Sequence, residues 1–280
     1  MNSTKMTWQG AAQIVDIKRA VFWGPWYVAE QRLRNMSKWM VSLISFGLGN
    51  PILFLFAIGL GVGSLVDANA GDKAIDGVGY LAFLAPALLA GAAIQAAMDE
   101  TSFPTLQGFL WEKNFFAMNA THLTPKSIVN GVLIASLIRA ALTTLLYEIV
   151  LLLFSAITWA SVFPLFISAM LAGGAFAAAM LATASKVVDD DGFFAIVGRF
   201  VIAPMMLFSG TYFPINTLPI YLQPIGWISP VWHATNLGRV LSYGLPIEPW
   251  LFAIHIGYLA SMFIGGSLIA TRLFAKRLDS

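Results

Sequence analysis

Residues 99–127, "DETSFPTLQGFLWEKNFFAMNATHLTPKS", form the most polar long stretch of a strongly apolar chain. The apolar runs "YLAFLAPALLAGAAIQAAM" (80–98) and "IVNGVLIASLIRAALTTLLY" (128–147) flank it on either side. Each run is long enough for a membrane-spanning helix, which needs about 20 mostly apolar residues. A short segment with single charges and bulky aromatic residues between two spans predicts a surface helix that meets a partner. The fold class indicated is an all-α polytopic membrane protein.

Composition supports a membrane location. Of the 280 residues, 58% are hydrophobic and 11% are charged, whereas a soluble domain carries about 25% charged residues. This much apolar surface requires the bilayer as solvent. The absence of cysteine excludes disulfides and thiol catalysis. Residues 1–38 have no continuous apolar centre of about 7–15 residues, so we expect no signal peptide there.

The apolar runs and the basic residues together predict the topology. Six spans are expected, at about 40–63, 78–98, 128–150, 162–185, 193–213 and 250–271. If the N-terminus is cytoplasmic, the inner segments hold thirteen of the sixteen Lys and Arg residues, as the positive-inside rule favours. Outer segments hold Lys73 and Arg239, and Arg139 falls within a span. Both termini are therefore expected in the cytoplasm.

Three regions follow from this topology. They are a cytoplasmic tail with an interfacial helix (1–39), a six-helix transmembrane domain (40–271) and a cytoplasmic C-terminal tail (272–280). In the first region, large aromatic residues alternate with basic ones, among them Trp23 and Lys38. This mixture is typical of a helix lying in the membrane interface. The alternative is an unstructured basic tail.

The segment 214–249 is too apolar for a free loop and too rich in proline for a normal span. Proline in a helix interior costs about 3 kcal/mol. Two short helices that enter the membrane from outside and return would fit this pattern. Irregular backbone at membrane depth is tolerated only against protein or a wet cavity.

Motifs for enzymatic chemistry or ATP binding are missing from the sequence. The three histidines, His122, His233 and His255, have no metal-ligand spacing. Without a P-loop motif, any ATP must be bound and hydrolysed by another chain. We therefore expect no cofactor, no nucleic-acid partner and no enzymatic activity of this chain's own.

The acidic run Asp189, Asp190 and Asp191 admits two interpretations. It could bind a divalent metal, although such sites usually need a second acidic cluster, which the sequence lacks. The favoured interpretation is a solvated turn at the start of a helix, where the helix dipole stabilises negative charge.

Two charged residues, Arg139 and Glu148, lie in the predicted third span. A charge inside a span is expensive and marks a functional candidate. Nine residues separate them, which places them on opposite faces of one helix. Arg139 could instead pair with Glu100 or Asp99 at the inner end of the second span. Glu100–Arg139 is the pair that we propose, and the alternative is that Arg139 extends to water.

Two further stretches complete a resemblance to a known family. One is "MVSLISFGLGNPILFLFAIGLGVG" (40–63), with Asn50 and Pro51 in its middle, and the other is "FSGTYFPINTLPIYLQPIGWISPVWH" (208–233). Together with 99–148, they resemble the permease of type-2 ATP-binding-cassette (ABC) exporters. The nearest subgroup is that of nodulation lipo-oligosaccharide and antibiotic-resistance exporters. The resemblance covers about 20–275.

The resemblance implies an assembly of two permease chains, expected to be identical, above two cytoplasmic ABC ATPase subunits. A coupling helix at about 104–120 would transmit ATP-driven movement, and the alternative is a helix that merely lies on the lipid. Phe109 would add an aromatic anchor to the expected coupling residues. Those residues are Leu110, Trp111, Glu112, Lys113, Asn114, Phe115, Phe116 and Met118.

The resemblance also implies a connecting helix at about Trp23–Lys38 and outer re-entrant helices at 214–249. The translocation path would follow the interface between the two permease chains. The residues expected along it are Asn50, Met205, Met206 and Phe208, with the small residues Ala87, Gly91 and Ala92. The implied function is ATP-driven export of an amphiphilic drug-like or lipid–saccharide molecule across a bacterial plasma membrane.

Two other functions stay open from the residues alone. A proton-coupled transporter would depend on a titrating carboxylate, with Glu148 and Glu100 as the candidates. An intramembrane enzyme acting on lipid would need a metal at 189–191.

Overall fold

The computed structural model describes residues 17–70, 75–189 and 192–279. Every regular element in these residues is helical, which confirms the predicted all-α fold. Five of the described helices are long and apolar enough to cross a membrane, so the chain is a multi-pass membrane protein. They are Met40–Asn69, Tyr80–Leu110, Pro125–Leu153, Trp159–Ala184 and Pro249–Leu278.

The first four of these helices agree in position with the first four predicted spans. The first is built from α2 (Met40–Phe54), the π-helical η1 (Leu55–Gly63) and α3 (Ser64–Ala70). After the short 3₁₀ helix η2 (Ile75–Gly77), the second begins with α4 (Tyr80–Thr101). The third and fourth are α7 (Pro125–Leu153) and α8 (Trp159–Ala184). The last is α13 (Pro249–Leu278).

The predicted fifth span, 193–213, is shorter than expected. It consists of α9 (Phe193–Val197), the π-helical η3 (Gly198–Ile202) and α10 (Ala203–Phe208). The helix ends there because Gly210 adopts a positive φ of 72°, which a helix cannot continue. A total of six spans therefore stays a prediction.

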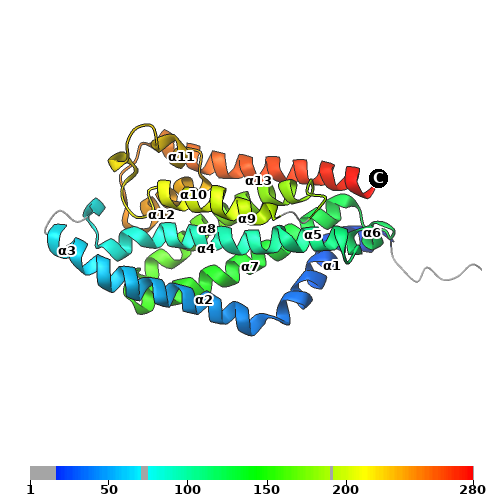
Figure 1. The fold of residues 1–280 in the computed structure, drawn as a ribbon, viewed down its shortest axis with the longest axis horizontal. Helices are drawn as coiled ribbons and strands as arrows, with labels where there is room; N and C mark the ends of the chain where they lie inside the picture. The colour runs from blue at the N-terminus through cyan, green and yellow to red at the C-terminus, as the bar shows by residue number, and fades with distance from the viewer. Residues whose placement is uncertain (1–16, 71–74, 190–191, 280) are drawn as a thin grey trace, which may run out of the picture.

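The proline-rich segment forms short helices at the end of the bundle where α3 and α11 lie, which we name the α11 end (Figure 1). They are η4 (Ile215–Thr217), α11 (Gln223–Trp227) and α12 (Pro230–Tyr243). Pro224 and Pro230 lie in the first turns of α11 and α12, where the missing N–H has no helical partner to lose. The prolines thus start these helices instead of breaking them.

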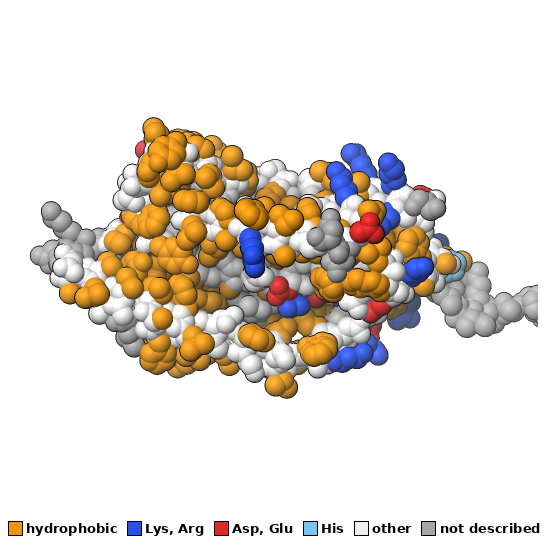
Figure 2. Space-filling view, viewed as in Figure 1, with side chains coloured by type: hydrophobic (Ala, Val, Ile, Leu, Met, Phe, Trp, Pro, Cys, Tyr) orange, Lys and Arg blue, Asp and Glu red, His pale blue; other side chains and the backbone are white. Residues whose placement is uncertain are grey.

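At the opposite end of the bundle, the α5–α6 end, two short helices lie beside the C-terminus (Figure 1). They are α5 (Phe103–Leu110) and α6 (Asn114–Asn119). Lys and Arg side chains gather at this end, whereas hydrophobic side chains cover the middle and the α11 end (Figure 2). This distribution is what a bilayer around the middle of the bundle would require.

Small residues let α8 pack closely against α4 and α13. A Cβ atom at Gly173 would lie 3.1 Å from the carbonyl oxygen of Ala93, and one at Gly266 would lie 2.7 Å from the carbonyl carbon of Ala178. Close backbone approach through small residues is a common means of helix association in membranes. The two buried helices α4 and α8 form the centre of the bundle, and α13 packs on α8 from the outside.

The helix α1 (Ile17–Ser37) precedes the spans and meets α2 at a sharp bend (Figure 1). Its buried face packs against α7, where a Cβ atom at Gly131 would lie 2.5 Å from the Cβ of Val28. Phe22, Trp23 and Trp26 are exposed. Over its described residues the segment is a helix, not the unstructured tail considered as an alternative, and its place in the membrane interface stays a prediction.

Candidate functional site

The stretch predicted to hold the coupling helix, about 104–120, contains two short helices, and its coupling role stays a prediction. We name residues 103–119, α5 and α6 with the turn between them, the coupling segment. Lys113 adopts a left-handed φ of 51°, which interrupts a helix. The Glu112 carboxylate accepts hydrogen bonds of 2.7 Å from the side-chain amides of both Gln107 and Asn114. These two bonds brace the turn from either side.

The predicted aromatic anchors divide into two sets. Phe109 and Phe115 are buried, with ring centroids 4.9 Å apart, and both contact Phe274 near the end of α13. Trp111 is 53% exposed and Phe116 is 38% exposed. The first set attaches the coupling segment to the bundle, and only the second set is available to a partner.

The other predicted coupling residues surround these aromatic rings. Leu110, Asn114 and Met118 are half-buried, whereas Glu112 and Lys113 are exposed. Glu112 is occupied in bracing the turn, so Lys113 is the charged side chain that a partner would meet first.

Arg277 ties the coupling segment to two spanning helices. Its guanidinium lies 4.1 Å from the ring centroid of Phe109. It also donates hydrogen bonds to the carbonyl oxygens of Ser185, at 3.0 Å, and Val187, at 2.7 Å, just after α8. A displacement of the coupling segment would therefore act on the ends of both α8 and α13.

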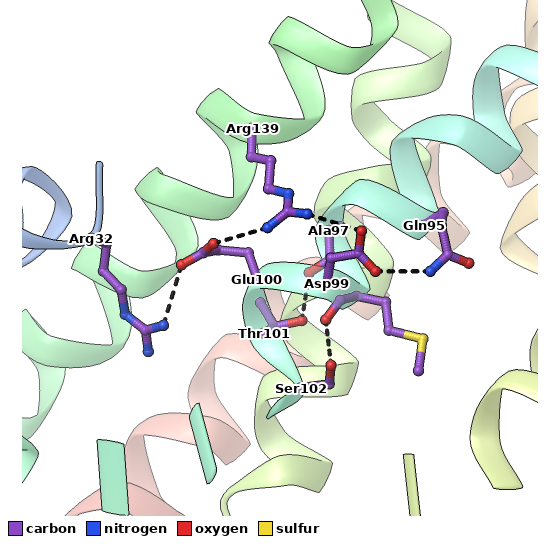
Figure 3. A network of polar contacts seen from close by, with 9 residues as sticks. Arg32, Gln95, Ala97, Asp99, Glu100, Thr101, Ser102 and Arg139 are labelled. Carbon is purple, nitrogen blue, oxygen red and sulfur yellow. Dashed lines mark hydrogen bonds and ion pairs between the residues drawn. The ribbon is translucent and has the colours of Figure 1, made fainter. Parts of the chain in front are cut away.

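Four charged residues form an ionic cluster that joins α1, α4 and α7 (Figure 3). Arg32 Nη1 donates to Glu100 Oε1 at 3.2 Å, and Arg139 Nη1 lies 3.5 Å from Glu100 Oε2. Arg139 Nη2 also donates to Asp99 Oδ2 at 3.0 Å. The structure thus brings together Glu100 and Arg139, the two residues that the sequence suggested as a pair.

Arg32 is the member of the ionic cluster that sequence reasoning missed. Its side chain and that of Glu100 are each 8% exposed. Burial lowers the pKa of the Arg32 guanidinium, and the Glu100 carboxylate opposes that shift. The sequence held a pattern that could have identified Arg32, because helical spacing places Val28, Ala29 and Arg32 on one face, which is the buried face of α1. Removing one partner of such a buried pair costs about 3–5 kcal/mol.

A cavity of about 1050 Å³, which we name the groove, runs beside the ionic cluster. All four cluster residues line one part of it, together with polar side chains of α4 and the coupling segment. The remaining lining is mixed, with apolar side chains beside polar ones such as Ser42, Asn50 and Thr143. Representative apolar residues are Phe46, Phe54, Leu88 and Met206. One cavity thus combines charged, polar and apolar side chains in its lining.

Some of the residues predicted for the translocation path line the groove, and others do not. Asn50, Met206, Gly91 and Ala92 line it. Among the others, Met205 packs into the hydrophobic core and Ala87 is fully buried, while Phe208 is half-buried and is not part of the lining. Sequence could not separate Met205 from Met206, because which of two adjacent side chains faces the cavity depends on how η3 and α10 are rotated.

Glu148 lies apart from the groove. It is 1% exposed, and neither carboxylate oxygen has a hydrogen-bond partner among the described residues. Its neighbour Tyr147 lines the groove, but Glu148 does not. An isolated carboxyl group in a span is therefore a separate candidate from Glu100.

Two histidines join α12 to α13. The Nδ1 atoms of His233 and His255 lie 2.8 Å apart, and His233 Nε2 lies 3.0 Å from the carbonyl oxygen of Trp227. Tyr258 stacks on the His233 ring with centroids 4.0 Å apart. These contacts fit a packing role.

The possible metal site cannot be assembled from the described residues, which contain no group of three His, Cys, Asp or Glu side chains able to hold a metal ion. Asp189 is exposed. Asp190 and Asp191, the rest of the acidic run, lie outside the described residues. His122 is exposed beside the start of α7.

Comparison with known proteins identifies related chains. The ABC-2 type transporter family matches residues 26–243. Nodulation protein J of Rhizobium leguminosarum bv. viciae is 30% identical over 248 residues, which cover 88% of this chain and 92% of the relative. Nodulation protein J of Rhizobium meliloti is 30% identical over 249 residues, covering 88% and 91%. That of Sinorhizobium fredii is 30% identical over 261 residues, covering 91% and 95%.

Proposed function

This chain belongs to the ABC-2 type transporter family, and from that premise we propose how it acts as the membrane permease of an ATP-driven exporter. A separate ABC ATPase binds the coupling segment from the cytoplasm. The observation that carries this proposal is the division of the aromatic residues. Trp111 and Phe116 are exposed, while Phe109 and Phe115 fix the same segment in the bundle.

The exposed aromatic residues suit an ATPase pocket. Large aromatic side chains contribute much of the binding energy at protein interfaces. Trp111 and Phe116 flank the exposed Lys113, whose charge would orient the partner through an acidic side chain. The turn that carries these three residues is held in shape by Glu112, so little ordering is needed on binding.

Movement would pass from the coupling segment to the bundle along two routes. One runs through Phe109 and Phe115 to Phe274 on α13. The other runs from α5 into the end of α4, where Glu100 binds both Arg32 and Arg139. Closure of the ATPase dimer would thus shift α1, α7 and α13 together and change access to the groove.

The groove is proposed as this chain's share of the translocation path. Its volume is near the range of about 300–1,000 Å³ that is typical of small-molecule sites. A cargo with a polar head and an apolar body would place its head near Gln95 and the ionic cluster and its body along Phe54 and Leu88. The cargo class is therefore amphiphilic, either drug-like or a lipid–saccharide.

The proposed complex contains two copies of this permease and two ATPase subunits in a bacterial inner membrane. Both termini would be cytoplasmic, because Lys and Arg gather at the α5–α6 end beside the C-terminus (Figure 2). The second permease copy would complete the path.

A proton-coupled transporter remains as a second candidate, because Glu148 is a buried carboxyl group without a hydrogen-bond partner among the described residues. Ionisable residues within spans often mark proton relays. This candidate predicts transport by the chain alone and dependence on Glu148.

Copurification tests the proposed function. The tagged chain is purified from its own membranes in mild detergent, and the eluate is assayed for ATP hydrolysis and for a protein with a P-loop motif. We expect an ATPase with the intact chain and loss of it with Trp111→Ala/Phe116→Ala. The matched control is Trp159→Ala/Phe163→Ala, an exposed pair at the start of α8. An ATPase retained by both double variants, or absent from the intact chain, would contradict the proposal.

A further inference from the structure

Two histidines at the α11 end belong neither to the groove nor to the ionic cluster. His233 of α12 is 3% exposed, and His255 of α13 is fully buried. Their Nδ1 atoms lie 2.8 Å apart, and His233 Nε2 lies 3.0 Å from the carbonyl oxygen of Trp227 in α11. The pair therefore joins three helices that meet at this end of the bundle.

The two contacts decide where the protons of the pair lie. A neutral imidazole has one N–H donor and one acceptor nitrogen. The Trp227 carbonyl can only accept, so His233 carries its proton on Nε2, and His255 must donate from Nδ1 to His233 Nδ1. The remaining nitrogen, His255 Nε2, is enclosed and has no hydrogen-bond partner among the described residues. In this state it carries no proton.

A third proton cannot be added to the pair without disrupting it. On His233 Nδ1 the proton would face the N–H of His255 across 2.8 Å. On His255 Nε2 it would be a buried donor without an acceptor, which is costly. Exchange of the His255 tautomer restores the bond between the rings but also moves a proton onto Nε2. Separation of α12 from α13, with entry of water, is the arrangement that hydrates the imidazolium.

The helices that pack against α12 and α13 supply no partner for the added charge. None of the ion pairs among the described residues includes a histidine. The helices α6, α8 and α11 contain no ionisable residue. In α4 and α7, Asp99, Glu100 and Arg139 belong to the ionic cluster, and Glu148 has no hydrogen-bond partner among the described residues. The remaining ionisable residues of α4 and α7 are Tyr80, Lys126 and Tyr147.

The helices α12 and α13 themselves do not compensate the charge either. Glu248, the N-cap of α13, lies two helical turns before His255, about 10 Å along the axis. Tyr258 stacks on the His233 ring with centroids 4.0 Å apart. This stacking favours a cation but gives His255 Nε2 no acceptor. The other ionisable residues of the two helices are cations or tyrosine, namely Arg239, Tyr243, Arg272, Lys276 and Arg277.

The same contacts decide how α11 is held. Tyr258 donates a hydrogen bond to the carbonyl oxygen of Ile228, at the end of α11. α11 in turn packs on α10, where a Cβ atom at Gly226 would collide with the carbonyl oxygen of Phe208. The loop after α10 carries Tyr212, which lines the groove. Movement of α11 and α12 away from α13 would therefore loosen one wall of the groove.

We propose that His233 and His255 form an acid-sensitive latch, which holds α11 and α12 against α13 while both rings are neutral and releases them when the pair gains a proton. Burial lowers the pKa of His233 below its usual value of 6.5. The latch is therefore closed at neutral pH and opens as the pH falls below about 6.5. Its link to transport rests on the proposed function: with both termini cytoplasmic, the α11 end faces outside, and external acid would open the outer end of the groove.

Double electron–electron resonance, which measures the distance between two spin labels, tests the latch. The chain contains no cysteine, so labels can be attached at introduced cysteines alone. One pair, Tyr221→Cys and Trp159→Cys, joins the loop before α11 to the start of α8, and both positions are exposed. A second pair, Trp159→Cys and Trp111→Cys, spans the bundle and reports unfolding. The full chain is measured in lipid nanodiscs, without ATPase or nucleotide, from about pH 8 to about pH 5.

His255→Asn separates the latch from general effects of acid. An asparagine amide can donate to a neutral His233 or, after rotation, accept from a protonated one. The variant thus keeps the contact and removes the buried nitrogen that has no acceptor. His122→Asn is the matched control, because His122 is exposed and lies between α6 and α7.

We expect a second Tyr221–Trp159 distance to appear in acid in the labelled parent chain and in His122→Asn, with the Trp159–Trp111 distance unchanged. In His255→Asn the pH of half-release should fall by about one unit, as removal of a buried unpartnered donor predicts. An unchanged distance in the parent chain, an unchanged midpoint in His255→Asn, or a change in both label pairs would overturn the latch.

His233→Gln serves where His255→Asn does not fold. It removes the ring that makes both contacts, so the pH-dependent change should be lost, and a change that persists would overturn the latch. The outcome is independent of the proposed function. Acid release in a chain that captures no ATPase would retain the latch and remove the proposed function, whereas ATPase capture without acid release would do the reverse.

Discussion

Glu100, near the end of α4, accepts a hydrogen bond of 3.2 Å from Arg32 of α1, although 68 residues separate the two in sequence. This bond attaches a helix outside the spans to the spanning bundle at the point where the coupling segment begins. The second oxygen of Glu100 lies 3.5 Å from Arg139 of α7. One carboxylate therefore joins three helices.

Arg32→Met is expected to destabilise the protein by about 3–5 kcal/mol, because it removes one of the two guanidinium groups that contact the buried Glu100 carboxylate. Arg34→Met is the matched control. Arg34 forms an exposed pair with Glu30 on the same helix, and such pairs contribute little. Thermal unfolding in one detergent compares the two variants. Equal midpoints would mean that the ionic cluster does not stabilise the position of α1.

Phe115→Ala and Phe116→Ala should have opposite effects although the residues are adjacent. Phe115 is buried, so its truncation should cost about 3–5 kcal/mol of stability. Phe116→Ala should leave thermal stability nearly unchanged and weaken ATPase copurification. Measuring both properties in both variants tests the division of the aromatic residues. If the stability loss appeared with Phe116 instead, the assigned packing would be incorrect.

Glu148→Gln separates the two candidate functions. Glutamine keeps the shape of the side chain but cannot release a proton. An ATP-driven exporter should retain transport in this variant, whereas a proton-coupled transporter should lose it. The measurement is movement of an NBD-labelled glycolipid in proteoliposomes that contain the variant with its copurified ATPase. Abolished efflux with normal folding would favour proton coupling.

The contact between His233 and His255 predicts a pH dependence of stability. The bond from His233 to the Trp227 carbonyl leaves Nδ1 of His233 as an acceptor, so His255 Nδ1 must donate. Burial lowers the pKa of His233 below its usual value of 6.5. The folded state therefore binds fewer protons than the unfolded state, and stability is full above about pH 6.5 and falls as the pH decreases.

The unfolding midpoint should accordingly decrease between about pH 7 and about pH 5, and the decrease should be smaller in His233→Gln. His122→Gln removes an exposed histidine and should behave as the native chain does. Identical pH profiles for all three proteins would exclude His233 as the titrating group.

The sequence predicted the elements that depend on local pattern. Uninterrupted apolar runs located α4, α7, α8 and α13 because a spanning helix satisfies its own backbone and needs only length and hydrophobicity. The polar stretch at 99–127 marked the position of the short helices α5 and α6, because its charges interrupt the apolar runs on either side. Proline positions anticipated the short helices of the α11 end.

Features that depend on packing could not be predicted in this way. In "LWEKNFF" (110–116), the break at Lys113 changes the direction of the chain, so helical periodicity could not tell that Phe115 is buried while Trp111 and Phe116 are exposed. The Arg32–Glu100 contact joins α1 to α4, two segments far apart in sequence, so it depends on how α1 packs against the bundle. The shorter fifth apolar helix reflects the turn at Gly210.

Reconstitution into proteoliposomes tests most directly whether this permease is driven by a separate ATPase. Vesicles contain either the chain alone or the chain with its copurified ATPase, and movement of an NBD-labelled glycolipid is followed with ATP or with an imposed pH gradient. Movement is expected only when the ATPase and ATP are both present, and it should be lost in Trp111→Ala/Phe116→Ala. Movement by the chain alone, driven by the pH gradient, would contradict ATP-driven export.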